Sequence, residues 1–328
     1  MLDKLKTIIG EIRQIRWDVF HIERNIVKES FHWTFSVGGG GIKGPYVFVC
    51  DGVMNHGGFF DRMKGIISIY ALSKVRHRRF IIYFVHPFNL EEYLVPNRYA
   101  WNSKDISFDY PYSKPVVGYF EFLYPWRIMM NRIGEVHYYF GYNILTRING
   151  RYKTNFDWSA LYHELFKPAP FLQTEIDALK SKFGSNYLSV HVRFLNLLGD
   201  DNENESRYKT LPEEERNELI MKVKDTITGL HKKQNIPLLL STDSNVFLDA
   251  MRSESFILTV PGVSRHIDNE EQETQQKKRE NIKLFLDYYM LAKGQQVISI
   301  IGCGLYQSDF PRYSAIIGGK PFRRINLE

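Results

Sequence analysis

The sequence predicts an α/β fold built from two domains. Short apolar runs rich in β-branched and aromatic residues alternate with longer segments in which apolar residues recur at helical spacing. This alternation is typical of parallel sheets covered by helices. The length of 328 residues leaves room for two domains of ordinary size. Because Pro168 and Pro170 interrupt a helical pattern near the middle of the chain, we expect one domain over residues 1–166 and another over 167–328.

The composition excludes several classes of protein. Apolar residues make up 44% of the chain and charged residues 24%, ordinary values that exclude a disordered, collagen-like or coiled-coil chain. No apolar run has the length of about 20 residues that a membrane-spanning helix needs, and the first residues lack a signal-peptide pattern. Two cysteines, Cys50 and Cys303, make no disulfide scaffold. We expect a cytoplasmic protein, whose net charge of +6 suits an anionic ligand or surface.

Residues 1–30 are expected to form an amphipathic helix or a pair of helices. One interpretation is a helix lying on an anionic membrane, which would place the protein peripherally at the inner membrane face. The other is a helix packed on its own domain or on another subunit, and it is favoured because any surface helix shows such periodicity. The pattern consists of Leu5, Ile8, Ile9, Ile12, Ile15 and Val19, interspersed with Lys4, Lys6, Arg13 and Arg16.

In the first domain, residues 46–50 and 80–84 are predicted strands, and a loop over 51–58 and a helical pattern lie between them. Strand, helix and strand within about 40 residues form one βαβ unit of a parallel sheet. Residues 135–140 are a further predicted strand and residues 157–166 a predicted helix.

A basic cluster ends the helical pattern of that unit, and it contains Lys74, Arg76, His77, Arg78 and Arg79. Nucleic-acid binding is one interpretation. The other is that the cations complement the dipole at the carboxyl end of a helix. The second is preferred, so we expect no nucleic-acid partner.

The second domain repeats the alternation more regularly. Strands are predicted at 187–193, 237–241, 256–260 and 297–301, helices at 172–183, 212–233, 245–251 and 277–292, and a loop and short tail thereafter. Four strands with intervening helices predict a doubly wound sheet, whose ligands bind beyond the carboxyl ends of the strands. The motifs discussed next all follow predicted strands.

The first motif, residues 57–62, opens the helix of the first βαβ unit. Gly57 and Gly58 allow a phosphate or sugar to approach the backbone closely, and free N–H groups at a helix start attract anions. Arg62 would add a positive charge for such a ligand. The structural alternative is a tight turn in which Asp61 caps the helix.

The second motif is the strand end that carries His191 and Arg193. These two residues share one face of the strand. Because a buried parallel strand should be almost entirely apolar, both side chains call for an explanation. The planar fork of Arg193 suits a diphosphate. The alternative is a structural ion pair beside a core histidine.

Two more motifs follow the later strands. Thr242, Asp243 and Ser244 either meet a ribose or base, or cap the next helix. Gly302, Gly304 and Ser308 form either a loop of phosphate-binding N–H groups or an ordinary connection. There is no Walker A sequence, no G-x-G-x-x-G, no H-E-x-x-H, no G-x-S-x-G and no Asp-x-Asp pair.

Taken in this order, the motifs resemble those of the GDP-fucose-dependent fucosyltransferase superfamily, which includes α1,2-, α1,6-, protein O- and nodulation fucosyltransferases. The resemblance runs from about residue 46 to the end of the chain. The matching segments are Gly57 to Arg62, the junction Phe166 to Leu172, His191 to Arg193, Thr242 to Ser244, and Ser308 to Ala315.

The resemblance implies a GT-B architecture, in which two Rossmann-like domains face a central cleft. It also implies inverting, metal-independent transfer of fucose to a hydroxyl of a glycan, as in bacterial-type surface polysaccharide synthesis, with GDP-fucose as donor substrate and no cofactor. The nucleotide would bind mainly to domain 167–328, and domain 1–166 would form the acceptor side. Arg193 would hold the β-phosphate with His191 beside it, and Asp243 would meet the guanosine between Thr242 and Ser244. Ser308, with Asp309 and Phe310 next to it, would contact phosphate, and Gly57, Gly58 and Asp61 would face the donor.

The catalytic base stays open, because the sequence after Arg193 lacks the second Arg and the nearby Asp of many members, and Phe60 replaces a Gly. Asp200, Asp61 and Asp51 are the candidates. Two other functions also stay open: a GT-B transferase for another nucleotide sugar, and a catalytically silent protein that binds nucleotides or glycans.

Overall fold

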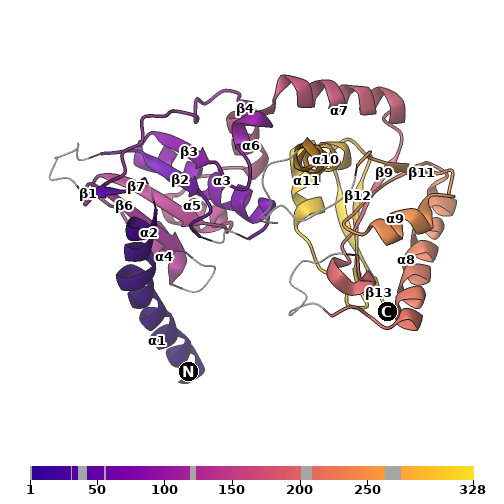
Figure 1. Ribbon diagram of the computed structural model, residues 1–328, viewed down its shortest axis with the longest axis horizontal. Helices are drawn as coiled ribbons and strands as arrows, with labels where there is room; N and C mark the ends of the chain where they lie inside the picture. The colour runs from indigo at the N-terminus through magenta and orange to yellow at the C-terminus, as the bar shows by residue number, and fades with distance from the viewer. Residues whose placement is uncertain are drawn as a thin grey trace. The chain divides into compact units, whose positions relative to one another are not determined.

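The computed structural model describes residues 2–30, 32–35, 43–54, 57–118, 123–200, 209–262 and 275–328. The chain divides into two compact units, Met1–Lys167 and Pro168–Glu328 (Figure 1). The domain boundary predicted after residue 166 lies one residue before this division.

The first unit contains a parallel four-stranded sheet in the order β3-β2-β7-β6. Its strands are β2 (Tyr46–Cys50), β3 (Phe80–Phe84), β6 (Ser113–Gly118) and β7 (Glu135–Phe140). All five residues of β2 are buried, as expected for a central strand. Helix α3 (Phe59–Arg76) lies so close to this sheet that a Cβ at Gly65 would stand 1.8 Å from the carbonyl oxygen of Phe140. Glycine is therefore required at this helix–sheet contact.

The remaining elements of this unit surround the sheet. The predicted N-terminal helix pair is present, joined by one π-helical turn. The elements outside the sheet are α1 (Leu2–Trp17), η1 (Asp18–Ile22), α2 (Glu23–Glu29), β1 (Thr34–Phe35), η2 (Leu90–Glu92), β4 (Leu94–Pro96), β5 (Asp109–Tyr110), α4 (Tyr124–Ile128), α5 (Leu145–Tyr152), α6 (Trp158–Leu165) and β8 (Phe166–Pro168).

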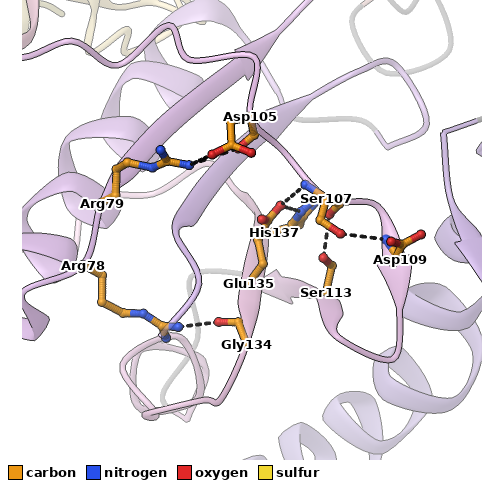
Figure 2. A network of polar contacts seen from close by, with 9 residues as sticks. All are labelled: Arg78, Arg79, Asp105, Ser107, Asp109, Ser113, Gly134, Glu135 and His137. Carbon is orange, nitrogen blue, oxygen red and sulfur yellow. Dashed lines mark hydrogen bonds and ion pairs between the residues drawn. The ribbon is translucent and has the colours of Figure 1, made fainter. Parts of the chain in front are cut away.

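A buried polar network stands at the amino end of β7. Glu135 and His137 point to each other, with 2.6 Å between Oε1 and Nε2, and the backbone N–H of Ser107 donates to the same Oε1 over 2.9 Å (Figure 2). Ligands of parallel sheets bind at the opposite, carboxyl end. We therefore interpret this network as structural: it attaches the segment before β6 to the sheet.

The basic cluster at the end of α3 contacts other parts of the same unit. Lys74 pairs with Glu164 at 2.6 Å, and Arg79 pairs with Asp105 at 2.6 Å. Arg78 donates to the carbonyl oxygen of Gly134 (Figure 2). These three cations are therefore used in contacts within the unit, and their interaction with the dipole of α3 stays a prediction.

The second unit contains a parallel five-stranded sheet in the order β11-β10-β9-β12-β13. Helices α8 and α9 cover one face of this sheet, and α10 and α11 cover the other (Figure 1). The strands are β9 (Leu188–Val192), β10 (Leu238–Thr242), β11 (Ile257–Thr259), β12 (Val297–Gly302) and β13 (Phe322–Leu327), and the helices are α7 (Pro170–Phe183), η3 (Leu195–Leu198), α8 (Glu213–Gln234), α9 (Asn245–Met251), α10 (Gln275–Leu291) and α11 (Phe310–Gly318).

The end of the chain differs from the prediction. Instead of a loop and a tail, residues 310–328 form α11 and a fifth strand, β13. The sequence of β13 contains Arg323 and Arg324, which are not typical of a buried parallel strand. Both are exposed because β13 lies at the edge of the sheet, where a strand has one neighbour.

Candidate nucleotide-sugar site

The strand order places the second motif at the point where the topology of the second sheet reverses. From β9 the chain proceeds outward on one side to β10 and β11, and then returns to build β12 and β13 on the other side. The crevice at such a switch point is the ligand site of doubly wound sheets. Arg193 follows β9 directly, and the loop after Gly302 follows β12, so both motifs meet at this crevice.

Arg193 is partly exposed, and its position is set by two neighbours. Its Nε lies 3.7 Å from Oδ2 of Asp243, and its guanidinium lies over the ring of Tyr306, 5.4 Å from the centroid. The backbone N–H of Tyr306 also donates to the carbonyl oxygen of Arg193 over 2.9 Å. The side chain keeps 26% of its surface exposed. A guanidinium held in this way is suited to bind a phosphate with two parallel hydrogen bonds.

The carboxylate of Asp243 shapes the backbone next to Arg193. Its two oxygens accept hydrogen bonds from the backbone N–H groups of Phe194 and Leu195, at 2.8 and 2.9 Å. The segment that carries Arg193 is therefore attached to the turn after β10. The contact with guanosine that we predicted for Asp243 stays a prediction, and the structure adds this positioning role.

Thr242, Ser244 and Asp200 build the start of α9. Ser244 is the N-cap and accepts from the N–H of Phe247 over 3.0 Å, while Thr242 accepts from the N–H of Ser244 over 3.3 Å. Asp200 Oδ2 accepts from the hydroxyl of Ser244 and from the N–H of Val246, at 2.9 and 2.8 Å. The capping interpretation therefore holds for Ser244, and it extends to Asp200, a candidate base from another loop.

His191 is buried on the face of β9 that α10 and α11 cover. Burial, and secondly the charge of Arg193, lowers the pKa of His191 to about 3, so the imidazole is neutral near pH 7. Its ring lies 5.4 Å from the ring of Phe310 on α11. Its Nδ1 is buried and has no hydrogen-bond partner among the described residues. An unmatched buried nitrogen is costly unless a ligand or water completes it.

This histidine predicts a specific dependence of stability on pH. The pKa of His191 is about 3 in the folded state and near 6.5 in the unfolded state, so the unfolded chain takes up a proton first as the pH falls. As far as His191 contributes, the free energy of unfolding is highest above pH 6.5 and declines from there toward pH 3. Between pH 7.5 and pH 5 we expect the free energy of unfolding to fall by about 2 kcal/mol through this residue. His191→Asn should remove that part of the slope in urea titrations. His163→Gln, a substitution at the surface, is the control, and equal changes in both variants would contradict the prediction.

The loop after β12 makes a tight reversal and leads into α11. Gly302, Cys303 and Gly304 all have positive φ, and a Cβ at Gly302 would stand 2.3 Å from the carbonyl oxygen of Leu327. Ser308 is buried and accepts from the N–H of Phe310 over 3.1 Å, so its hydroxyl helps to start α11. Asp309 lies 3.8 Å from Arg324 on β13. The predicted phosphate contacts of this loop stay predictions.

Helix α10 contains a buried ion pair that was not predicted from the sequence. Lys283 and Asp287 are one turn apart and almost fully buried, with 2.9 Å between Nζ and Oδ2, and Lys283 also donates to the carbonyl oxygen of Val260 over 3.3 Å. Burial raises the pKa of Asp287, while Lys283 and Ser241 favour its ionised form. Ser241 is the register neighbour of His191. The sequence does contain a pattern that indicates this pair. Residues 284–292 are almost all apolar, so a helix over them is buried, and two opposite charges one turn apart on it must be buried and paired.

The first motif lies at the carboxyl end of β2, the strand at which the first sheet reverses. Gly58 is the N-cap of α3, and Gly57 has a φ of +70°. The carboxylate of Asp61 is 42% exposed and pairs with Lys64 at 2.8 Å. Arg62, in contrast, is buried and donates to the carbonyl oxygens of Gly57 and His86, at 3.1 and 3.0 Å. The idea that Arg62 offers a charge to a ligand is therefore wrong: it holds the turn in place.

Asp51 is the third candidate base and directly follows β2. Its Oδ1 accepts from the N–H of Val53 over 3.1 Å, and its Oδ2 accepts from the hydroxyl of Tyr139 over 3.2 Å. Burial, and secondly Asp51, raises the pKa of Tyr139. Both oxygens of Asp51 are therefore already hydrogen-bonded inside the unit.

A metal-binding cluster and a membrane-spanning helix are both absent from the described ranges. No three His, Cys, Asp or Glu side chains gather there in a way that could hold a metal ion. Over the same residues, none of the helices combines the length and the apolar character needed to cross a bilayer.

The fold is similar to that of solved fucosyltransferases. No protein-family model and no curated protein matches the sequence. NodZ α-1,6-fucosyltransferase soaked with GDP-fucose aligns over 84% of this chain and 93% of its own, with a TM-score of 0.52 and 14% identity. NodZ from Bradyrhizobium aligns over 83% and 92%, with a TM-score of 0.53 and 15% identity. A mutant of Arabidopsis thaliana FUT1 in complex with GDP aligns over 93% and 75%, with a TM-score of 0.56 and 10% identity. The chain thus has the α/β fold of GT-B fucosyltransferases, as the motifs led us to expect.

Proposed function

We propose that this protein is a glycosyltransferase that transfers fucose from GDP-fucose to a glycan hydroxyl with inversion at the sugar. The observation that carries the proposal is Arg193, a partly exposed guanidinium at the switch point of the second sheet, beside the buried, neutral His191. The fold is shared with NodZ soaked with GDP-fucose and with a FUT1 mutant in complex with GDP, and this likeness supports a nucleotide sugar as donor. The bacterial-type surface glycan expected from the sequence remains part of the proposal.

The proposed reaction breaks the bond between the sugar carbon and the β-phosphate oxygen of the donor. Negative charge grows on that oxygen as the bond breaks, and a cation placed there lowers the barrier. Arg193 supplies this charge, and Asp243 keeps the segment that carries Arg193 in place. Neutral His191 offers Nδ1 as a hydrogen-bonding group for the nucleotide, and its low pKa makes it a poor proton donor near pH 7.

The acceptor hydroxyl attacks the sugar carbon from the opposite side and gives its proton to a base. Of the three candidates, we propose Asp61, because its carboxylate is partly exposed next to Gly57 and an acceptor can reach it. Asp200 instead caps α9, and Asp51 is held by Val53 and Tyr139. In this scheme the first unit provides the acceptor side and the base.

Asp61→Asn should abolish most turnover while leaving nucleotide binding intact. The amide cannot accept the proton, and general-base catalysis typically contributes 10²–10⁴-fold. We expect kcat to fall by about that factor and the Kd for GDP to stay unchanged. Asp105→Asn, which removes an exposed carboxylate of the same unit, is the control. Full turnover in Asp61→Asn together with loss in Asp51→Asn would transfer the role to Asp51.

The function itself is tested with the purified chain. Isothermal titration calorimetry with GDP should show saturable binding, and incubation with GDP-fucose and a panel of glycans should release GDP faster than without acceptor. A thermal-shift panel of GDP, UDP, CMP and dTDP sugars identifies the nucleotide, since a ligand of the native state raises its melting temperature. A preference for another nucleotide would overturn the choice of GDP-fucose. Binding without turnover on any acceptor would favour a silent binding protein.

A further inference from the structure

Two acidic residues of α1 and η1 face their own unit. Glu11 and Asp18 are 5% and 0% exposed. Glu11 accepts from the backbone N–H of Leu123, and Asp18 accepts from the hydroxyl of Tyr124. Carboxylates at these two positions therefore help to attach α1 and η1 to the segment that contains α4.

The opposite side of the same helix is apolar and basic. Ile9, Trp17 and Phe20 are 43%, 53% and 60% exposed, which is unusual for side chains of this size. Lys6, Arg13 and Arg16 lie between them and are exposed as well. We call these six residues the cationic–aromatic face. At 100° per residue they span one broad stripe, opposite the stripe that holds Glu11 and Asp18.

The side chains of the cationic–aromatic face are exposed, so within the described residues they are not part of the core. A shallow groove on it is lined by Arg13, Arg16, Trp17, Phe20 and His21. The rings of Trp17 and His21 stack with centroids 3.7 Å apart, and the guanidinium of Arg16 lies 6.0 Å from the Phe20 centroid. Helix α1 extends away from the sheet of its unit (Figure 1). The stripe is thus open to a partner from residue 6 to residue 20.

We propose that the cationic–aromatic face docks on an anionic phospholipid bilayer. Aromatic and aliphatic side chains of such a helix enter the boundary between headgroups and acyl chains, while Lys and Arg meet the phosphates. Two carboxylates that would repel such a surface, those of Glu11 and Asp18, are buried on the other side of the helix. A second copy fits less well, because two such faces would bring Arg13 and Arg16 of both copies together. The proposal does not depend on fucosyl transfer.

Vesicle sedimentation of the full chain tests the proposal without any substrate. The probes are vesicles of phosphatidylcholine alone and of equal parts phosphatidylcholine and phosphatidylglycerol. The protein should bind the anionic vesicles preferentially, and high salt should weaken the binding. Arg13→Gln combined with Arg16→Gln should lower the partition coefficient about thirtyfold, since each cation near the surface contributes about fivefold. Trp17→Ala combined with Phe20→Ala should lower it as well.

Matched variants control for charge and apolar surface. Lys232→Gln with Lys233→Gln removes two exposed cations of α8, and Met221→Ala with Phe171→Ala removes two exposed apolar side chains. Both should bind vesicles like the wild type, and GDP calorimetry shows separately whether the site in the second unit is intact. Equal binding to both vesicle types, or equal loss in the control pairs, would overturn the proposal. A dimer in analytical ultracentrifugation that Trp17→Ala with Phe20→Ala dissociates would assign the face to a second copy and also overturn it.

Discussion

Arg193→Ala is expected to reduce kcat by about 10²–10³-fold, the usual effect of removing one group that stabilises charge in a transition state. The side chain is partly exposed and its neighbours Asp243 and Tyr306 keep other contacts, so we expect the fold to persist. GDP should bind more weakly, because the same guanidinium meets the diphosphate in the ground state. The measurements are the initial rate of GDP release and the Kd for GDP by calorimetry.

Two further variants sharpen this experiment. Arg193→Lys keeps the charge but loses the fork that makes two parallel bonds, so its rate should lie between those of the wild type and Arg193→Ala. Arg252→Ala is the control, since that arginine is 81% exposed and, at the C-cap of α9, pairs with Asp249 of the same helix. Wild-type turnover in Arg193→Ala would remove Arg193 from the mechanism and with it the main support for the proposed function.

Lys283→Ala is expected to have the largest effect on stability. It leaves the buried carboxylate of Asp287 without its ion-pair partner, and breaking a buried pair from one side typically costs about 3–5 kcal/mol. The measurement is the free energy of unfolding from urea titrations. Removing both charges by Lys283→Met with Asp287→Leu should recover much of the loss, because packed apolar side chains can replace a buried pair.

A partly exposed pair of the same unit provides the comparison. Lys224 and Glu254 lie 2.9 Å apart with 34% and 28% of their side chains exposed. Lys224→Ala should cost at most about 1 kcal/mol, the range of partly solvated pairs. Equal costs for Lys224→Ala and Lys283→Ala would show that burial does not control the energy of the α10 pair.

The central strands β2, β7, β9, β10 and β12 and the edge strands β3 and β11 were predictable from sequence, whereas the edge strands β6 and β13 were not. The run 46–50 is buried on both faces and consists entirely of apolar residues, so its sequence predicts a strand directly. β6 contains Pro115, and β13 contains two arginines, which argue against a strand when read locally. Both lie at a sheet edge, where a missing N–H and charged side chains are tolerated.

In the candidate site, too, some features could be predicted from the sequence and others could not. A His and an Arg at the end of an apolar strand are anomalous in the sequence itself, so His191 and Arg193 could be found without a structure. The contacts of Asp243 and Asp200 could not, because their partners include backbone N–H groups about 50 residues away in the chain. Arg62 was misinterpreted for the same reason, since its carbonyl partner at His86 comes from the next loop.

Local pattern determines which segments of this chain become helices and central strands, because periodicity and propensity act over a few residues. It also marked the anomalous polar residues and the amphipathic start of the chain. Folding decided which strand ends meet at a switch point, which carboxylates are used within the protein, and which side of α1 faces outward. These outcomes depend on contacts between residues far apart in sequence, and burial then sets the pKa of His191 and the cost of separating Lys283 from Asp287.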